Sequence, residues 1–286
     1  MNAIELRNVY KDFGEFSLKN INLNIPCGYI VGLVGENGSG KSSLIKTILN
    51  LVKADKGEVN ILGENDLENN REVLGKTGVF LDDFYLPVEF TIIQIENIMK
   101  DIYSNWESDR FFDLIERFDL PLDKKIGEFS KGMKVKATLA ITLSHNASLL
   151  ILDEPTSGLD SVIRNELLEI FLDFMQEPNN SILLSSHISS DLEKIADYIA
   201  YIEDGEILFV ESKDTIIYEY GIIRCKKSQL GEIDLKDIIA CKENSMGYDI
   251  IISNKNYARK KYENLTIDDV NIDELILTMK RERLEK

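Results

Sequence analysis

The segment GENGSGKS at residues 35–42 fits the pattern GxxxxGK[ST] at every fixed position. Its glycines allow successive backbone N–H groups to turn inward around an anion, in a concavity that side chains would block. A helix that begins near Lys41 directs the positive end of its dipole at the same anion. Lys41 supplies a point charge for β- and γ-phosphates, and the Ser42 hydroxyl is a hard oxygen ligand for Mg²⁺. By itself the segment indicates an NTPase or a kinase, with a phosphate site made of Gly35, Glu36, Asn37, Gly38, Ser39, Gly40, Lys41, Ser42 and Ser43.

The elements that must hold this loop follow from the apolar pattern. A short apolar run at 29–34 leads into the loop, and residues 41–51 follow it with helical spacing. Strand, glycine loop and helix in this order begin a buried parallel sheet. Further buried strands are predicted at 149–152, 182–185 and 199–202, with helices at 161–175 and in pieces through 91–144. Alternating apolar residues near 4–6 and 18–25 predict an edge sheet, and Asp204-Gly205 predicts a hairpin turn.

Four segments downstream of the loop resemble, in order, the motifs of the ABC ATPases. Residues 129–134, FSKGMK, resemble the LSGGQ signature in their Ser-x-Gly frame, and LLILDEP at 149–155 looks like the Walker B strand. SGLD at 157–160 is similar to the D-loop, and Ser185-Ser186-His187 looks like the switch histidine that closes the next strand. The resemblance covers about residues 1–215 and leaves the C-terminal tail outside it.

This resemblance implies roles for particular residues. Asp153, at the end of a buried strand, can hold the Mg²⁺ shell beside the phosphate loop, and Glu154 would be the general base or the group that positions the attacking water. His187 would hydrogen-bond the γ-phosphate region. The resemblance also implies a head-to-tail dimer, in which a second protomer closes over the nucleotide with signature and D-loop residues equivalent to Ser130, Gly132 and Asp160.

Two further expectations concern the base and the metal. Phe13 matches the aromatic residue that stacks on adenine, with Tyr10 as its rival. Where the family has a glutamine after the strand near 78–81, we align Asp82, with Asp83 as the alternative. Asp82 is thus a predicted catalytic and metal-contacting residue that acts through water. Lys131 and Met133 also replace the usual Gly and Gln of the signature, as in ATPases encoded apart from their permeases in drug, peptide or lantibiotic export.

Composition restricts the partners. The formal net charge is −17, and because residues 221–286 carry 13 basic and 12 acidic residues the acidity belongs to residues 1–220. Nucleic acids bind by exchanging counterions for Lys and Arg, so a nucleic-acid partner is not expected. Three scattered cysteines argue against a disulfide framework or a zinc site and favour a reducing compartment. No secretory signal and no run of about 20 apolar residues is visible.

The sequence therefore predicts an α/β P-loop NTPase core of the ABC ATPase type, with a parallel central sheet and an antiparallel β subdomain. An inserted helical subdomain is expected at about 84–145, within an ATPase domain at 1–215, and a small α+β appendage at 216–286. The expected function is ATP hydrolysis with Mg²⁺ that powers a separate integral membrane permease, from a cytoplasmic position at the inner face of the membrane. The second ATPase subunit could make a homodimer or a heterodimer. The alternative is a soluble ABC ATPase with a role in assembly or regulation.

Overall fold

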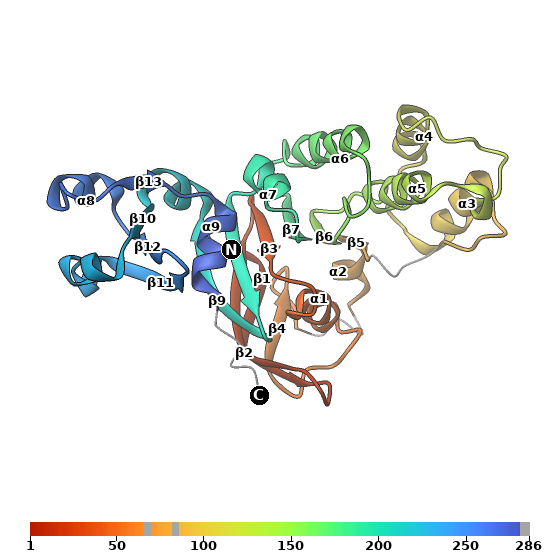
Figure 1. Ribbon diagram of the computed structural model, residues 1–286. Coiled ribbons are helices and arrows are strands. Elements are labelled where there is room, and N and C mark those ends of the chain that lie inside the picture. The colour runs from red at the N-terminus through yellow and green to blue at the C-terminus, as the bar shows by residue number, and fades with distance from the viewer. Residues whose placement is uncertain (66–69, 82–85, 281–286) are drawn as a thin grey trace.

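The computed structural model describes residues 1–65, 70–81 and 86–280. A mixed sheet occupies the middle of the molecule, between a group of helices at one end and a small sheet at the other (Figure 1). Its six strands lie in the order β5-β6-β7-β3-β8-β9, and β9 alone runs antiparallel to its neighbour. The strands are β5 (Thr77–Phe80), β6 (Leu149–Asp153), β7 (Ser181–Ser186), β3 (Ile30–Val34), β8 (Tyr198–Glu203) and β9 (Glu206–Ser212).

The central strands are apolar along their whole length because both faces of the sheet are covered. In β6, Leu149 and Ile151 join one apolar cluster while Leu150 and Leu152 join another, as the two-residue period of a strand requires. The first cluster lies under the N-terminal sheet β2-β1-β4, helix α1 and Val73 of the short helix α2 (Arg71–Gly75); the second lies under the remaining helices of the ATPase core. The bounds are β1 (Asn2–Asp12), β2 (Ser17–Pro26), β4 (Lys56–Ile61) and α1 (Lys41–Ile48).

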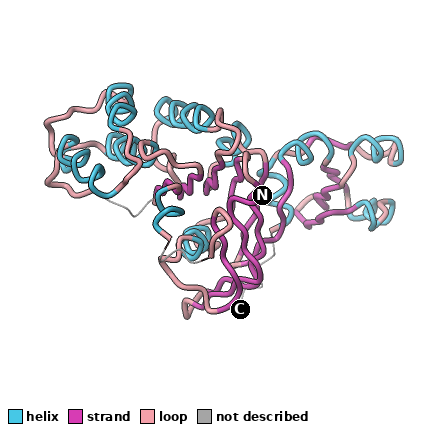
Figure 2. Tube along the Cα trace, turned by 180° about the vertical axis from the view of Figure 1, so that it is seen from behind, coloured by secondary structure: helices cyan, strands magenta, loops and turns pink. Residues whose placement is uncertain are grey.

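The helices on the other face come from two parts of the chain. One group precedes β6 and extends away from the sheet at one end of the molecule, and the other follows β6 and β7 and packs on the sheet (Figures 1 and 2). Thr91 begins the insertion with a capping box, since its hydroxyl accepts from the Gln94 amide and the Gln94 side chain accepts from the Thr91 amide. The helices of this face are α3 (Ile92–Ile102), α4 (Ser108–Arg117), α5 (Lys131–Leu143), α6 (Ser161–Phe174) and α7 (Ser189–Ile195), whereas α2 belongs to the first face.

The C-terminal part forms an antiparallel sheet in the order β11-β12-β10-β13. One face, with Ile223 and Ile250, makes a separate apolar cluster beneath α8. The other face, with Ile222 and Ile251, joins the apolar cluster of the ATPase core. The elements are β10 (Gly221–Cys225), β11 (Ile238–Asn244), β12 (Gly247–Ile252), α8 (Lys255–Lys261), β13 (Ile267–Asp269) and α9 (Ile272–Met279).

These observations confirm the predicted fold class, including the parallel sheet, the antiparallel subdomain and the inserted helices. The hairpin at Asp204-Gly205 is present, with both residues at positive φ, as a tight turn between β8 and β9 demands. The sequence missed α8, β11 and β13, whose apolar runs are short. The boundary between an ATPase domain at 1–215 and an appendage at 216–286 stays a prediction, because the two parts share one apolar cluster. No helix within the described ranges is both long and apolar enough to cross a bilayer.

Candidate active site

Three neighbouring strands bring the predicted chemical groups to one edge of the sheet. The phosphate loop follows β3, Asp153 and Glu154 lie at the end of β6, and His187 follows β7. Strands β6, β7 and β3 are adjacent and parallel, so their carboxyl ends meet at the same edge. Ligands of open α/β sheets bind at such an edge. The sheet order thus unites segments that lie more than a hundred residues apart in sequence.

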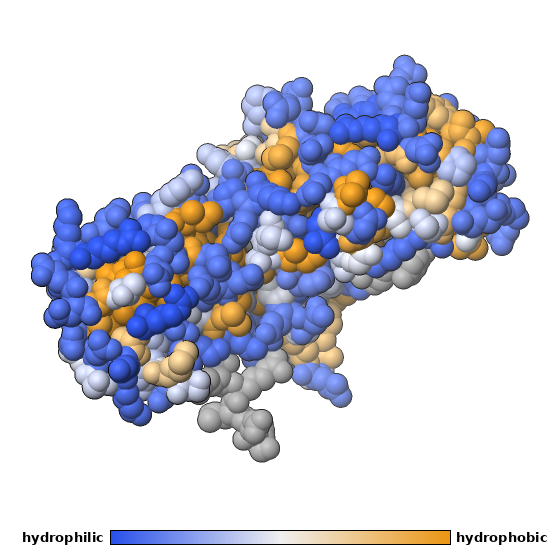
Figure 3. Space-filling view, turned by 45° about the horizontal axis from the view of Figure 1, so that its top comes forward, coloured by the Kyte–Doolittle hydropathy of each residue, from blue (hydrophilic) through white to orange (hydrophobic). Residues whose placement is uncertain are grey.

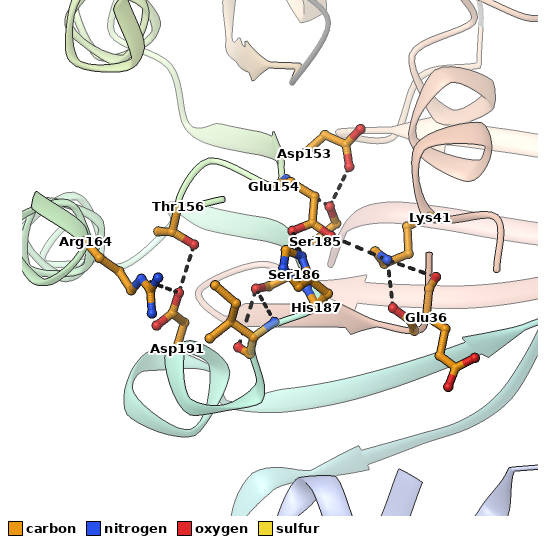
Figure 4. A network of polar contacts seen from close by, with 12 residues as sticks. Glu36, Lys41, Asp153, Glu154, Thr156, Arg164, Ser185, Ser186, His187 and Asp191 are labelled. Carbon is orange, nitrogen blue, oxygen red and sulfur yellow. Dashed lines mark hydrogen bonds and ion pairs between the residues drawn. The ribbon is translucent and has the colours of Figure 1, made fainter. Parts of the chain in front are cut away.

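Lys41 is the first residue of α1 and is only 5% exposed. Its ammonium group donates to the carbonyl oxygens of Gly35 at 2.7 Å and Glu36 at 3.2 Å. The same nitrogen lies 3.4 Å from Glu154 Oε1 (Figure 4). A buried cation is costly unless it is paired, and these contacts meet that requirement at the floor of the loop.

Two glycines are required for the shape of the loop. Gly40, the N-cap of α1, has a φ of +112°, and a Cβ there would lie 2.6 Å from the ring of Phe16. A Cβ on Gly35 would lie 2.4 Å from the carbonyl oxygen of Ile202. The loop therefore packs closely against β8 on one side and against Phe16 on the other, and side chains at these positions would displace it.

Glu154 has a left-handed backbone with a φ of +53°, which is uncommon outside glycine. Its amide is held by Ser185, with distances of 3.2 Å to the carbonyl oxygen and 3.1 Å to Oγ. Ser185 Oγ in turn donates to Asp153 Oδ1 at 2.5 Å. Glu154 Oε2 lies 2.6 Å from His187 Nδ1 and accepts the His187 amide at 3.3 Å. This strained conformation directs the Glu154 carboxylate at both Lys41 and His187 (Figure 4).

These groups face a cavity of about 660 Å³, within the range of ordinary ligand pockets. Phe13 is 40% exposed and lines the cavity, whereas Tyr10, similarly exposed, does not. Phe13 is thus the better placed of the two aromatic candidates. The lining residues are Phe13, Phe16, Asn37, Gly38, Gly40, Lys41, Ser42, Ser43, Glu154, Ser157 and His187.

Several predicted residues do not line this cavity. Ser130 caps α5 by accepting from the Met133 amide, and Asp160 caps α6 by accepting from the amides of Val162 and Ile163. Neither residue lines this cavity, and Gly132, Gly35, Glu36, Ser39 and Asp153 are likewise absent from its lining. Asp82 and its alternative Asp83 lie outside the described residues, so their role stays a prediction.

The sequence analysis gave no role to Phe16, and it named Ser157 and Ser185 only as members of longer motifs. Phe16 has a signal in the pairing of β1 with β2, which returns the chain beside Phe13; the two ring centroids are 6.1 Å apart. Ser157 lies three residues after Glu154 on the same loop. Ser185 lies two residues before His187, and nothing in its local pattern distinguishes it from a buried strand serine.

Magnesium would find oxygen ligands of the kind that it prefers. The Ser42 hydroxyl lines the cavity, and the carboxylate of Asp153, which is 3% exposed, is held nearby through Ser185. Mg²⁺ commonly uses one or two such protein ligands together with substrate phosphates and water. A protein-only cage is not needed, and the described residues contain no cluster of three or more His, Cys, Asp or Glu that could form one.

Comparison with known proteins supports the same reading. Residues 18–157 match the family described as ABC transporter. The chain is 32% identical to the ABC transporter ATP-binding protein YtrB of Bacillus subtilis, over 76% of this chain and 74% of that protein. It is 34% identical to the lantibiotic transport ATP-binding protein SrtF of Streptococcus pyogenes, over 74% and 91%, and 32% identical to the bacitracin transport ATP-binding protein BcrA of Bacillus licheniformis, over 72% and 68%.

A solved structure agrees with these relatives. The dimeric post-hydrolysis state of the ATP-binding cassette MJ0796 bound to ADP and Pi superposes with a TM-score of 0.64 at 25% identity, covering 73% of this chain and 98% of that one. The fold, the phosphate loop and the glutamate–histidine contact are all in place in this chain. It belongs to the ABC transporter family, as one of its ATP-binding and ATP-hydrolysing subunits.

Proposed function

We propose that this subunit uses ATP hydrolysis to power a separate membrane permease that exports a peptide antibiotic or a similar compound. The direct contacts that join Lys41, Glu154 and His187 at the cavity carry the ATPase part of this proposal. The export part draws on the bacitracin and lantibiotic transport proteins among the relatives.

The phosphates of ATP would lie along the loop, with Lys41 at the β- and γ-phosphates. The adenine would stack on the exposed ring of Phe13, beside the half-buried ring of Phe16, which also lines the cavity. A γ-phosphate at Lys41 would compete with the Glu154 carboxylate for the same ammonium group, since the two now lie 3.4 Å apart. Ser42 and Asp153 would hold Mg²⁺, which neutralises phosphate charge in such reactions.

Glu154 would then act on water. Its carboxylate accepts two contacts from His187, one from the ring and one from the amide, and it is 13% exposed at the cavity. A carboxylate in this position can accept the proton of an attacking water, while His187 holds it in place.

Closure over the nucleotide would come from a second protomer. Ser130 and Gly132 begin helix α5 away from the cavity of their own chain, with their amides at a helix N-terminus that favours anions. A head-to-tail dimer would place these groups on the γ-phosphate held by the partner, either a second copy or a different ATPase subunit.

The permease would bind the helical insertion. Ile93, Ile98 and Ile102 of α3 are at least 37% exposed, and apolar surface gathers at this end of the molecule (Figure 3). A cavity of about 750 Å³ lies between the end of α3 and α2, and Ile102 is among its lining residues. Exposed apolar surface of this kind marks interaction sites. The subunit would thus lie at the inner face of the membrane.

The test is reconstitution of this chain in liposomes with a polytopic membrane protein taken from a neighbouring gene. We expect the subunit and the membrane protein together to move a peptide antibiotic in an ATP-dependent manner. The same complex made with the Lys41→Ala subunit should lose that transport. Ile102→Glu should release the subunit from the permease and leave its own ATP hydrolysis intact. Stable assembly with a soluble complex, without any membrane protein, would favour the assembly or regulatory role instead.

A further inference from the structure

The loops that follow β6 and β7 are joined by two side-chain contacts. At the cavity, Glu154 contacts His187. Away from the cavity, the Thr156 hydroxyl donates to Asp191 Oδ2 at 2.8 Å, and both residues are 1% exposed. Thr156 lies two residues after Glu154, and Asp191 lies four residues after His187, in the first turn of α7. The hydrogen bond between Thr156 and Asp191 therefore joins the same two loops that carry the proposed catalytic pair.

A third residue extends this contact to the D-loop. Arg164 of α6 places Nε 3.9 Å from Asp191 Oδ2 (Figure 4). Its Nη2 donates to the carbonyl oxygen of Leu159 at 3.2 Å. The segment from Glu154 to Asp160 is thus held at its start by Ser185, in its middle by Asp191 and near its end by Arg164. None of these three supports lines the nucleotide cavity.

The pairing within this network is incomplete. Asp191 Oδ1 and Arg164 Nε are both buried and find no hydrogen-bond partner among the described residues. A buried carboxylate is costly to keep, and its replacement by apolar residues is often neutral or stabilising. Stability alone therefore does not explain why Asp191 Oδ1 and Arg164 Nε are buried without a hydrogen-bond partner among the described residues, which indicates a functional role. The strained backbone of Glu154 next to this network also needs its surroundings to hold it in place.

We propose that Thr156, Arg164 and Asp191 form a positioning network for ATP hydrolysis, with Asp191 at its centre. Asp191 fixes the spacing of the two loops, which keeps Glu154 and His187 in contact. Arg164 holds the Leu159 carbonyl, so the same carboxylate also sets the D-loop that faces the second protomer. This inference rests on the proposed roles of Glu154 and His187, and the three network residues act through that pair without touching the nucleotide.

The test compares two variants at Thr156, one that keeps the shape of the side chain and one that keeps its hydroxyl. Thr156→Val removes the hydroxyl that holds Asp191 and keeps the shape, so kcat should fall about tenfold, the worth of one hydrogen bond to a charged group. The KM for ATP should stay within about twofold, because the phosphate loop is untouched. Thr156→Ser keeps the hydroxyl and should restore kcat. Thr142→Val is the matched control: it removes a buried hydroxyl that bonds to the Thr138 and Val79 carbonyls, far along α5, and should change Tm without changing kcat.

A double-mutant cycle completes the test. Thr156→Val and Asp191→Asn act on one contact, so their effects on kcat should be strongly non-additive. Independent effects on kcat, or an unchanged kcat in a folded Thr156→Val protein, would overturn the network. The network would also be overturned if Thr156→Val and Thr142→Val lowered Tm equally and lowered kcat equally. Glu154→Gln is measured in parallel: full hydrolysis there removes the role of Glu154 itself, which is a different failure from an intact Glu154 effect with no Thr156 effect.

Discussion

Two lysines of this chain sit among carboxylates in different ways. Lys41 is 5% exposed, and its partners come from the phosphate loop and from the end of β6, on the edge of a cavity. Lys261 lies at the end of α8, and its side chain is 26% exposed. It contacts Asp234 at 2.9 Å and Asp237 at 2.7 Å, and the Tyr262 hydroxyl donates to Asp237 at 2.6 Å.

The two clusters differ in whether the lysine can exchange a carboxylate partner for a phosphate. The partners of Lys261 lie on one short stretch of chain, and the resulting network closes on itself. The hydrogen bonds from Lys261 hold the pKa values of Asp234 and Asp237 below their usual range, and in return the pKa of Lys261 is raised, chiefly by Asp237. Lys41 instead shares its cavity with a carboxylate on a strained residue, so a phosphate can replace that partner. The ion pairs of Lys261 join two segments of the C-terminal part and lie outside the lining of the nucleotide cavity, whereas the contacts of Lys41 are assembled across strands and open on that cavity.

The strongest test of this comparison changes the carboxylate in each cluster. Glu154→Gln keeps the shape and removes the base, so hydrolysis should fall by about 10²–10⁴. ATP binding should survive because Lys41, Ser42 and the loop are unchanged. With ATP retained, the variant should shift from monomer to dimer in light scattering, and ADP should leave it monomeric.

Asp237→Asn is the matched change in the other cluster and should leave hydrolysis at the wild-type rate. Ser130→Arg, added to Glu154→Gln, should block the ATP-dependent dimer. Wild-type turnover in Glu154→Gln would end the catalytic assignment whatever the dimer does.

The second test replaces the two lysines. Lys41→Ala should weaken ATP binding about 10- to 100-fold, the loss expected for hydrogen bonds from a charged donor to phosphate. Turnover should be lost with it. Lys261→Ala should change neither quantity, as measured by nucleotide titration and phosphate release. Undiminished ATPase activity in Lys41→Ala would contradict the assignment of Lys41, and not Lys261, to the nucleotide site.

The sequence predicted the first cluster better than the second for a physical reason. The phosphate loop, Asp153, Glu154 and His187 each lie in a short segment with a fixed pattern, and parallel strand order then brings the segments together. The Lys261 cluster has no such pattern, and neither has the contact of Asp191 with Thr156. Both depend on side chains from separate segments that meet only after tertiary packing. Phe16 was missed likewise because its place depends on strand pairing.

A third test uses acid. Asp234 and Asp237 have pKa values lowered by Lys261, so they stabilise the fold above their unfolded pKa, near 4, and lose that contribution as pH falls through the lower folded values. Wild-type Tm should therefore drop below about pH 4. Lys261→Met should lower Tm at pH 6 and reduce the dependence on pH below 4, as followed by thermal unfolding. A parallel shift at every pH would mean that Lys261 contributes only packing.

The smallest expected effect concerns a lysine that connects the two regions. Lys280, at the end of α9, donates to Glu36 Oε1 of the phosphate loop at 2.6 Å. Deleting the C-terminal part is a poor test of this contact, because Ile272 and Leu275 of α9 pack in the apolar cluster of the ATPase core. A point substitution isolates the contact.

Lys280→Ala should change ATP affinity by at most about fivefold, because the two side chains are 30% and 54% exposed and surface ion pairs contribute little. The effect should fade at 1 M salt, where screening extends to about 3 Å. Lys280→Arg should behave as wild type. Lys227→Ala breaks a comparable exposed pair with Glu243, away from the loop, and should leave affinity unchanged. A salt-resistant change of tenfold or more in Lys280→Ala would contradict the comparison. It would mean that the C-terminal part acts on the nucleotide site, and that Lys280 sets the conformation of the loop around Lys41.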